Sequence, residues 1–183
     1  MVNNRTNRHY SNVEAVDIIH QVANLYISTK APQDYGTGEE YTSVEVHTLK
    51  RIADKPGITL TELAKDYAKT KGAISQIVKK IEAKGLIYRE PAPGHDNKYY
   101  LYITEKGSAL DAAHRAYDQV NSGEAMNQVR ELVSKEDFNA AFRVLEIWLD
   151  VRREVQQQRL ERKKEQKRAR MKAKKNIKEV ESP

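Results

Sequence analysis

Residues that can recognise a nucleic acid gather between positions 70 and 80. They are Thr70, Lys71, Gly72, Ser75, Gln76, Lys79 and Lys80. A glutamine can pair with adenine in the major groove, and a lysine can reach guanine or a phosphate. Ser75 and Gln76 are the residues expected to select a base sequence, because lysines alone add affinity without sequence choice. For Lys79 and Lys80 the alternative is a merely solvated face.

The same segment has the apolar spacing of an amphipathic helix. Its apolar residues are Ala73, Ile74, Ile77, Val78 and Ile81. They recur at intervals of three and four residues, which is the helical period. The Thr70 hydroxyl can cap the start, and Gly85 suits the end because glycine accepts a positive φ. Such a helix would bury its apolar side and offer its polar side to the major groove, with the base-reading residues near its N-terminus.

The elements around this helix are predicted to complete a winged helix-turn-helix over residues 44–104. A short helix is expected over residues 44–53, and Pro56-Gly57 ends it. Thr59 and Glu62 have the spacing of a capping box, which predicts a second short helix. Residues 86–89 and 99–103 have strand patterns, with Pro91 expected to break the first. The fold class is therefore mainly α with a small two-stranded β-wing.

Two regions that flank the winged helix-turn-helix have the apolar spacing of helices with a broad apolar side. A helix is expected over residues 12–28, with Asn12 as its cap, and further helices over residues 105–151. The side chains that would form an interface are Val16, Ile19, Ala23, Leu145, Trp148 and Leu149. Core packing and a dimer interface both fit this pattern. Residues 1–11 are expected to be a disordered arm.

The positive charge of the chain lies at its C-terminus. The 183 residues carry a formal net charge of +6, yet residues 1–150 hold 19 basic and 21 acidic side chains. Residues 152–183 form a basic tail, in which the candidate DNA contacts are Arg162, Lys163, Lys164, Lys167 and Arg168. The tail can be a solvated helical extension, a disordered segment, or a flexible arm that contacts phosphates without base specificity.

Three runs carry a resemblance to a known family. They are Gly57–Ala64 (GITLTELA), Lys79–Ile87 (KKIEAKGLI) and Ile103–Leu110 (ITEKGSAL). They resemble the MarR family of transcriptional regulators, well over residues 40–115 and by helix order over residues 12–150. The resemblance implies a MarR-like domain over residues 12–151, in which residues 12–28 and 105–151 are dimerisation helices. It further implies a homodimer on a pseudo-palindromic operator, with half-sites about one helical turn apart.

The wing departs from the family pattern. The family usually carries an Asp and an Arg at the wing tip, and the Arg enters the minor groove. Here the tip reads GHDNK over residues 94–98, which puts Asn97 at the arginine position. The wing residues expected near DNA are Arg89, His95, Asn97 and Lys98. We expect the contacts at the wing tip to be weaker than those of the family, because Asn97 and Lys98 stand where the family's arginine enters the minor groove. A guanidinium is less strongly hydrated than an ammonium group and suits that groove better.

Several classes of function find no support in the sequence. The chain has no cysteine, and its five histidines have no multi-ligand spacing, so neither a metal nor another cofactor is expected. No glycine-rich phosphate loop or catalytic triad is present, which argues against an enzyme. No apolar run reaches about 18 residues, so a membrane partner is not expected.

The function expected is a sequence-specific DNA-binding regulator in the cytoplasm, a repressor that a small aromatic effector could release. Tyr10, Tyr26, Tyr41 and Tyr67 could line the effector pocket, although ordinary packing also explains them. One alternative is a sequence-indifferent DNA or RNA binder driven by the basic tail. Another is a winged-helix module that binds protein.

Overall fold

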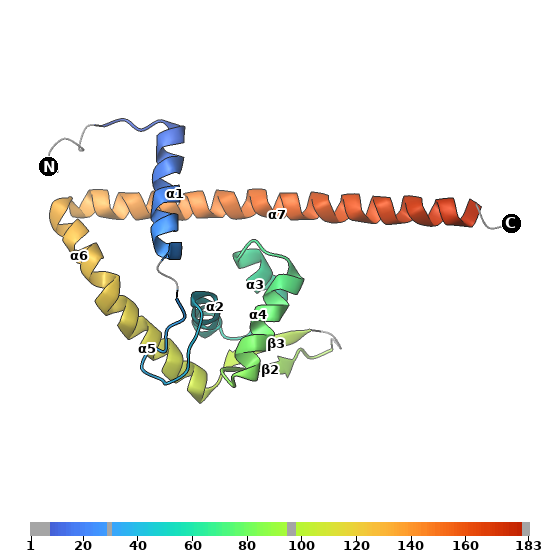
Figure 1. The fold of residues 1–183 in the computed structure, drawn as a ribbon, viewed down its shortest axis with the longest axis horizontal. Coiled ribbons are helices and arrows are strands. Elements are labelled where there is room, and N and C mark those ends of the chain that lie inside the picture. Colours follow the sequence, from blue (N-terminus) through green and yellow to red (C-terminus); the bar gives the residue numbers. More distant parts are fainter. Residues whose placement is uncertain (1–7, 29–30, 95–97, 181–183) are drawn as a thin grey trace.

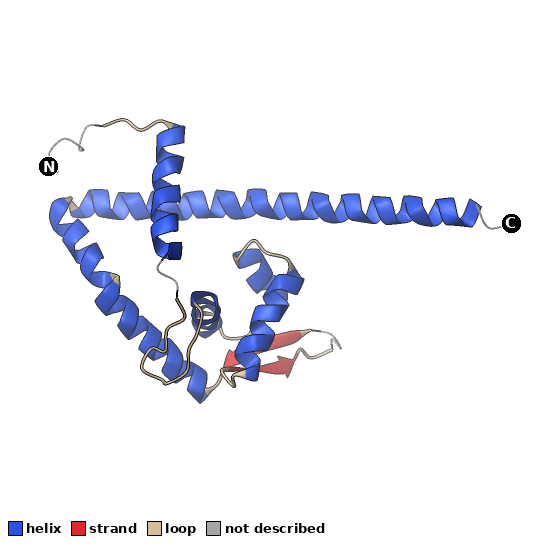
Figure 2. Ribbon diagram, in the orientation of Figure 1, coloured by secondary structure: helices blue, strands red, loops and turns tan. Residues whose placement is uncertain are grey.

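The computed structural model describes residues 8–28, 31–94 and 98–180. The elements in chain order are α1 (Asn12–Ser28), α2 (Ser43–Asp54), β1 (Ile58–Thr59), α3 (Leu60–Asp66), α4 (Lys71–Ala83), β2 (Ile87–Pro91), β3 (Tyr99–Ile103), α5 (Glu105–Asn121), α6 (Gly123–Leu132) and α7 (Lys135–Val180) (Figure 1). The fold is mainly helical with a small antiparallel sheet, as predicted (Figure 2). Most of the expected arm, residues 1–7, lies outside the described residues.

The core lies inside the winged helix-turn-helix, between α2, α3, α4, α5 and the sheet. Ile74, Val78 and Ile81 of α4 are fully buried, and they pack with Leu49 of α2 and Leu101 of β3. Each such side chain contributes roughly 1.5–3 kcal/mol through burial. The apolar spacing of the sequence therefore identified the buried side of α4, except for Ala73, which is exposed.

The sheet has one strand more than the predicted two-stranded wing. The strand order is β1-β3-β2, and Ile58 of β1 lies opposite Leu101 of β3. β1 has two residues, too few to show an alternating pattern. β2 extends two residues beyond the predicted end at residue 89, and Pro91 ends it, paired opposite Tyr99. A proline is tolerated there because β2 is an edge strand and its missing N–H removes no ladder bond.

Hydroxyl side chains begin the helices. The predicted capping box of Thr59 and Glu62 is present at α3, and Thr70 caps α4. The prediction that Asn12 caps α1 was wrong. Ser11 does so instead, with its hydroxyl accepting a hydrogen bond from the Glu14 backbone N–H at 3.3 Å.

α5 begins in close contact with the chain that leads into β2. The Thr104 hydroxyl donates to the Gly85 carbonyl at 2.7 Å and accepts from the Gly107 N–H at 3.0 Å. Gly107 is buried, and a Cβ there would lie 2.0 Å from the Leu86 carbonyl oxygen. The Thr-Glu-Lys-Gly run after the wing therefore ties α5 to the domain and requires a glycine at its last position.

The C-terminal region is helical throughout. α5 ends at Asn121, α6 begins at Gly123, and Ser134 lies just before the start of α7. α7 then runs for 46 residues to Val180, so the basic tail is a helical extension of the last helix. Figure 1 shows α7 as a long rod, with α5 and α6 leading to its start. Among the described helices, none combines the length and apolar character that a membrane crossing requires.

Candidate nucleic-acid interface

α4 presents the residues expected to read bases on the side away from the core. Lys71, Gly72 and Gln76 are exposed, as are Lys79 and Lys80, and Ser75 is half-buried. The Thr70 hydroxyl accepts a hydrogen bond from the Ala73 N–H at 3.2 Å, which fixes the first turn. The remaining N–H groups of that turn carry the positive end of the helix dipole and suit an anion.

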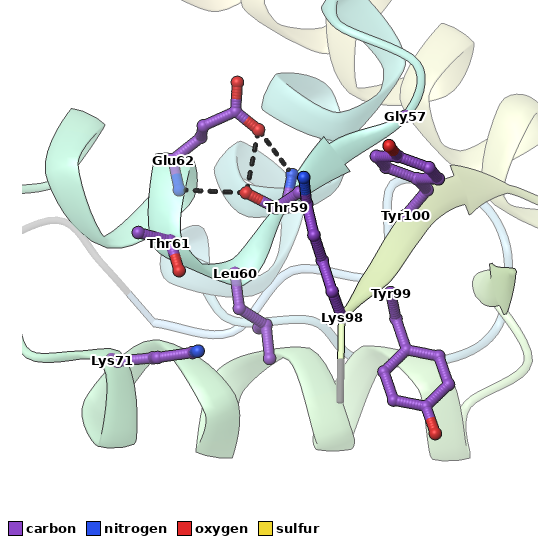
Figure 3. A pocket seen from close by; sticks show the side chains of 9 residues that line it. All are labelled: Gly57, Thr59, Leu60, Thr61, Glu62, Lys71, Lys98, Tyr99 and Tyr100. Atoms are coloured by element: carbon purple, nitrogen blue, oxygen red, sulfur yellow. Dashed lines mark hydrogen bonds between the residues drawn. The ribbon is translucent and has the colours of Figure 1, made fainter. Parts of the chain in front are cut away.

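A groove of about 590 Å³ lies beside the start of α4 (Figure 3). Its lining residues are Gly57, Thr59, Leu60, Thr61, Glu62, Lys71, Lys98, Tyr99 and Tyr100. Lys71 reaches the groove from the start of α4, and Lys98, the residue just before β3, reaches it from the wing (Figure 3). The groove therefore joins α4, the reading helix, to the tip end of the wing strand β3, with a cation on each side.

The charges at this surface leave the reading helix positive. Within the described chain, no carboxylate lies within 4 Å of the ammonium groups of Lys71, Lys79 or Lys80. The acidic group that lines the groove, Glu62, is paired with Lys55 at 2.8 Å. The hydrogen bond from Lys55, followed by those from the backbone and hydroxyl of Thr59, lowers the pKa of Glu62 to about 2. Glu62 is thus a neutralised anion at neutral pH.

The wing offers fewer free cations than the sequence suggested. The Arg89 guanidinium pairs with the Glu82 carboxylate of α4 at 2.6 Å, and its side chain is only 22% exposed. A contact between Arg89 and DNA stays a prediction, and it would compete with that ion pair. Lys98 is exposed, and its ammonium lies 5.4 Å from the centre of the Tyr100 ring. His95 and Asn97 lie outside the described residues.

Ion pairs fix the helices that carry the reading helix. Arg51 of α2 contacts Asp66 at the end of α3 at 2.6 Å. Arg115 of α5 contacts Asp54 of α2 at 2.7 Å, and hydrogen bonds from Lys50 and then from Arg115 lower the pKa of the Asp54 carboxyl. These contacts connect α3 through α2 to α5.

A second cavity, of about 490 Å³, lies between the end of α1, the start of α2 and the end of α5. His114 of α5 is buried, with its Nε2 atom 3.3 Å from an Asp118 carboxylate oxygen and its Nδ1 atom without a hydrogen-bond partner among the described residues. The His47 ring meets the His114 ring edge-on at 4.9 Å, and Tyr35 meets it at 5.3 Å. Nothing in the sequence signalled this pairing, because His47 and His114 are far apart in the chain.

Of the four tyrosines expected at an effector pocket, only Tyr26 lines this cavity. Tyr41 is buried in the core, and the Tyr67 hydroxyl donates to the His47 carbonyl at 2.9 Å. Tyr10 lies before α1 and is exposed. The described residues hold no group of three or more His, Asp or Glu side chains arranged to bind a metal ion.

Apolar side chains cover much of the surface of α1 and α7. On α1, Val16 and Ala23 are exposed and Ile19 is half-buried; on α7, Leu145 and Leu149 are exposed. Trp148 is half-buried, with Arg152 over its ring. The further large apolar side chains exposed on these two helices include Val13, Ile18, Val22, Leu25, Phe142, Val144, Ile147 and Val151. Within the described part of one chain, this surface is left uncovered.

Comparisons with known proteins agree with these observations. The model of the MarR family matches residues 41–95. The uncharacterized HTH-type transcriptional regulator YhjH of Bacillus subtilis is 27% identical over 90 residues, which are 49% of this chain and 51% of that protein. The HTH-type transcriptional repressor NicR of Pseudomonas putida is 29% identical over 99 residues, 51% of this chain and 63% of that protein. The chain thus spans only about half of such relatives.

Solved structures share the fold over a longer stretch. The transcriptional regulator SlyA superposes with a TM-score of 0.63 and 18% identity, over 80% of this chain and 97% of that one. The Staphylococcus aureus MepR–DNA complex gives a TM-score of 0.59 and 19% identity, over 78% of this chain and 99% of that one. These likenesses establish the winged-helix architecture.

Proposed function

We propose that this chain, which belongs to the MarR family of winged helix-turn-helix proteins, is a sequence-specific DNA-binding transcriptional regulator. The observation that carries the proposal is the surface of α4. Its buried side fixes the helix in the core, and its exposed side offers Ser75 and Gln76 between lysines that have no carboxylate partner in the described chain. A surface of this composition combines base recognition with phosphate attraction.

Each exposed group has a defined part in this function. α4 enters the major groove, where Gln76 pairs with adenine and Ser75 donates to or accepts from a base edge. Thr70 and Lys71 hold a backbone phosphate at the start of the helix. Lys98, at the tip end of β3, reaches the neighbouring backbone from the far side of the groove (Figure 3).

The regulator acts as a homodimer. The exposed apolar side chains of α1 and α7 gather on two helices, as they do at protein interfaces, and a second copy of the chain would cover them. Two copies related by a two-fold axis would place two α4 helices on a pseudo-palindromic operator. A dimer bound at a promoter would act as a repressor, which is also how the relative NicR is described.

A small aromatic effector would release the operator. The cavity beside His114 lies where α5, α2 and α1 approach each other, and Tyr35, Tyr117 and Asp118 offer it aromatic faces and a hydrogen-bond acceptor. An occupant would shift α5 and, through the Arg115–Asp54 ion pair, the spacing of the two reading helices. Operator affinity would then change through a shift in populations. We expect the regulator to act in the cytoplasm, without a metal or organic cofactor.

Selection of genomic fragments on the purified full-length protein tests the proposal. Fragments from the source organism are bound at near-physiological salt, recovered and sequenced. Enrichment of a two-fold symmetric site supports a dimeric regulator. Salt-sensitive binding without any enriched site supports the sequence-indifferent binder instead, and an absence of binding favours the protein-interaction module.

A further inference from the structure

The basic half of α7 is attached to the helix-turn-helix at one point. The Gln157 side-chain amide donates to the Ala64 carbonyl at 3.2 Å and lies 3.5 Å from the Lys65 carbonyl. These carbonyls lie at the end of α3, where they also accept the backbone N–H groups of Lys69 and Ala68 at 2.9 and 3.0 Å. The end of α3 leads directly into the turn before α4. The helix beyond Gln157 therefore starts next to the element that faces DNA.

Beyond this attachment the described side chains of the helix are almost all exposed. Of the described side chains between residues 158 and 171, all are exposed except Leu160, which is half-buried. Figure 1 shows this part of α7 projecting past α3 on the side toward which the far ends of β2 and β3 point. A rise of about 1.5 Å per residue carries Arg170 about 20 Å from Gln157.

The projecting segment carries a strong unpaired positive charge. Residues 158–171 contain seven basic and two acidic side chains. None of these basic groups has an ion-pair partner in the described chain. Like charges at helical spacing repel each other and destabilise a helix in water. A polyanion alongside the segment would remove that repulsion and stabilise the helix.

Four of the basic residues fall in a single stripe. At 100° per residue, Arg159, Lys163, Lys167 and Arg170 lie within an arc of about 80° on one side of the helix. The two acidic residues, Glu161 and Glu165, fall outside this arc. Arg162, Lys164 and Arg168 also fall outside it, so only Lys163 and Lys167 of the five tail residues expected at DNA belong to the stripe.

We propose that this stripe of α7 is a second DNA-binding element, which holds backbone phosphates of duplex DNA next to the site read by α4. Its ligand is the phosphate backbone, so it adds affinity and salt sensitivity without selecting a sequence. Duplex DNA is favoured over RNA or an acidic protein because the segment leaves the domain beside the end of α3, which leads directly into α4 and its exposed lysines. The position of the stripe relative to α4 rests on the proposed function.

The test compares binding to one 40-base-pair duplex of arbitrary sequence over a range of salt concentrations. The stripe variant is R159Q/K163Q/K167Q/R170Q, because glutamine keeps the helix propensity. The matched control, R162Q/K164Q/R168Q, removes charge from the other sides of the same segment. R159K/R170K keeps the charge. These side chains touch nothing in the domain, and circular dichroism verifies that each variant remains helical.

Loss of four phosphate contacts makes the slope of log affinity against log salt about 3.6 less steep. Raising salt from 50 to 200 mM then weakens the wild type about a hundredfold more than the stripe variant. The control changes the slope by less than 1, and R159K/R170K keeps the wild-type slope. Equal slopes for the stripe variant and the control would overturn the proposal, as would stripe-dependent binding that prefers single-stranded RNA of the same length.

This experiment is independent of base recognition. Because the duplex has an arbitrary sequence, a stripe effect can appear even if the fragment selection enriches no site, in which case only the proposed function fails. Conversely, an enriched site bound with an unchanged salt slope by the stripe variant refutes the role of α7 alone.

Discussion

Replacement of Gly107 by alanine tests how α5 is joined to the DNA-binding domain. The added Cβ would lie 2.0 Å from the Leu86 carbonyl oxygen, 3.0 Å from its carbon and 3.3 Å from Leu49 Cδ1. That carbonyl cannot move freely, because it accepts the Thr104 N–H at 3.0 Å. Overpacking of this kind costs about 1–3 kcal/mol, and a backbone clash lies at the upper end.

The gain in helix propensity from alanine, about 1 kcal/mol at most, offsets only part of this loss. We therefore expect Gly107→Ala to lower the free energy of unfolding by about 2 kcal/mol or more, which in a chain of this size lowers Tm by roughly 4–8 °C. Thermal unfolding followed by circular dichroism at a fixed protein concentration measures the shift.

Gly72→Ala is the matched control for this measurement. Gly72 also lies in the first turn of a helix, and a Cβ there would meet no atom within 4 Å. The same substitution should leave the stability of the domain unchanged or raise it by up to about 1 kcal/mol. Equal Tm values for the two variants would refute the close approach of α5 to the Leu86 carbonyl.

Three further outcomes follow from the contacts described above. Glu82→Gln removes the ion-pair partner of Arg89. DNA affinity, measured by fluorescence anisotropy, should rise, and the slope of log affinity against log salt concentration should steepen by about 1. An unchanged slope would show that Arg89 stays away from phosphate. Leu149→Glu puts a charge on the exposed apolar surface of α7, so it should dissociate the proposed homodimer, as measured by sedimentation velocity. The control Glu161→Gln, on the basic half of α7, should leave the homodimer intact. The lowered pKa of Glu62 stabilises the fold above the unfolded pKa near 4.5, and that contribution is lost as the pH falls toward 2. Glu62→Gln should therefore reduce the loss of stability between pH 5 and pH 2, and an unaltered pH profile would contradict the assignment.

The reading helix could be predicted because local signals agree there. The isoleucine and valine spacing, the Thr70 cap and the positive φ of Gly85 all depend on residues close together in sequence. The two residues of β1 could not be predicted, because their strand is defined only by pairing with β3. The continuation of α7 past Val151 was left open, because its charged residues suit an exposed helix and a disordered tail equally well.

The contacts that surround the reading helix could not be predicted, because they join distant parts of the chain. The ion pair between Arg89 and Glu82 forms only when β2 packs beside α4, which changes the environment expected for Arg89. His47 of α2 contacts His114 of α5, and Gln157 of α7 contacts α3 from a distant part of the sequence. A sequence identifies the residue types at such points but not their partners.

The ratio of affinities for the enriched site and for a random duplex tests the central claim most directly. Proteins that bind specific sites usually show ratios of about 10³–10⁷. A well-paired side chain discriminates by about 1–3 kcal/mol, so its loss from both half-sites should cost S75A/Q76A about a hundredfold in this ratio. The control S108A/Q119A removes the same groups from exposed positions on α5.

The account predicts that S75A/Q76A binds the random duplex as the wild type does but shows about a hundredfold less preference for the enriched site, while S108A/Q119A keeps the wild-type preference. If S75A/Q76A retains the wild-type ratio, α4 is not the element that reads DNA, and the proposed function is wrong.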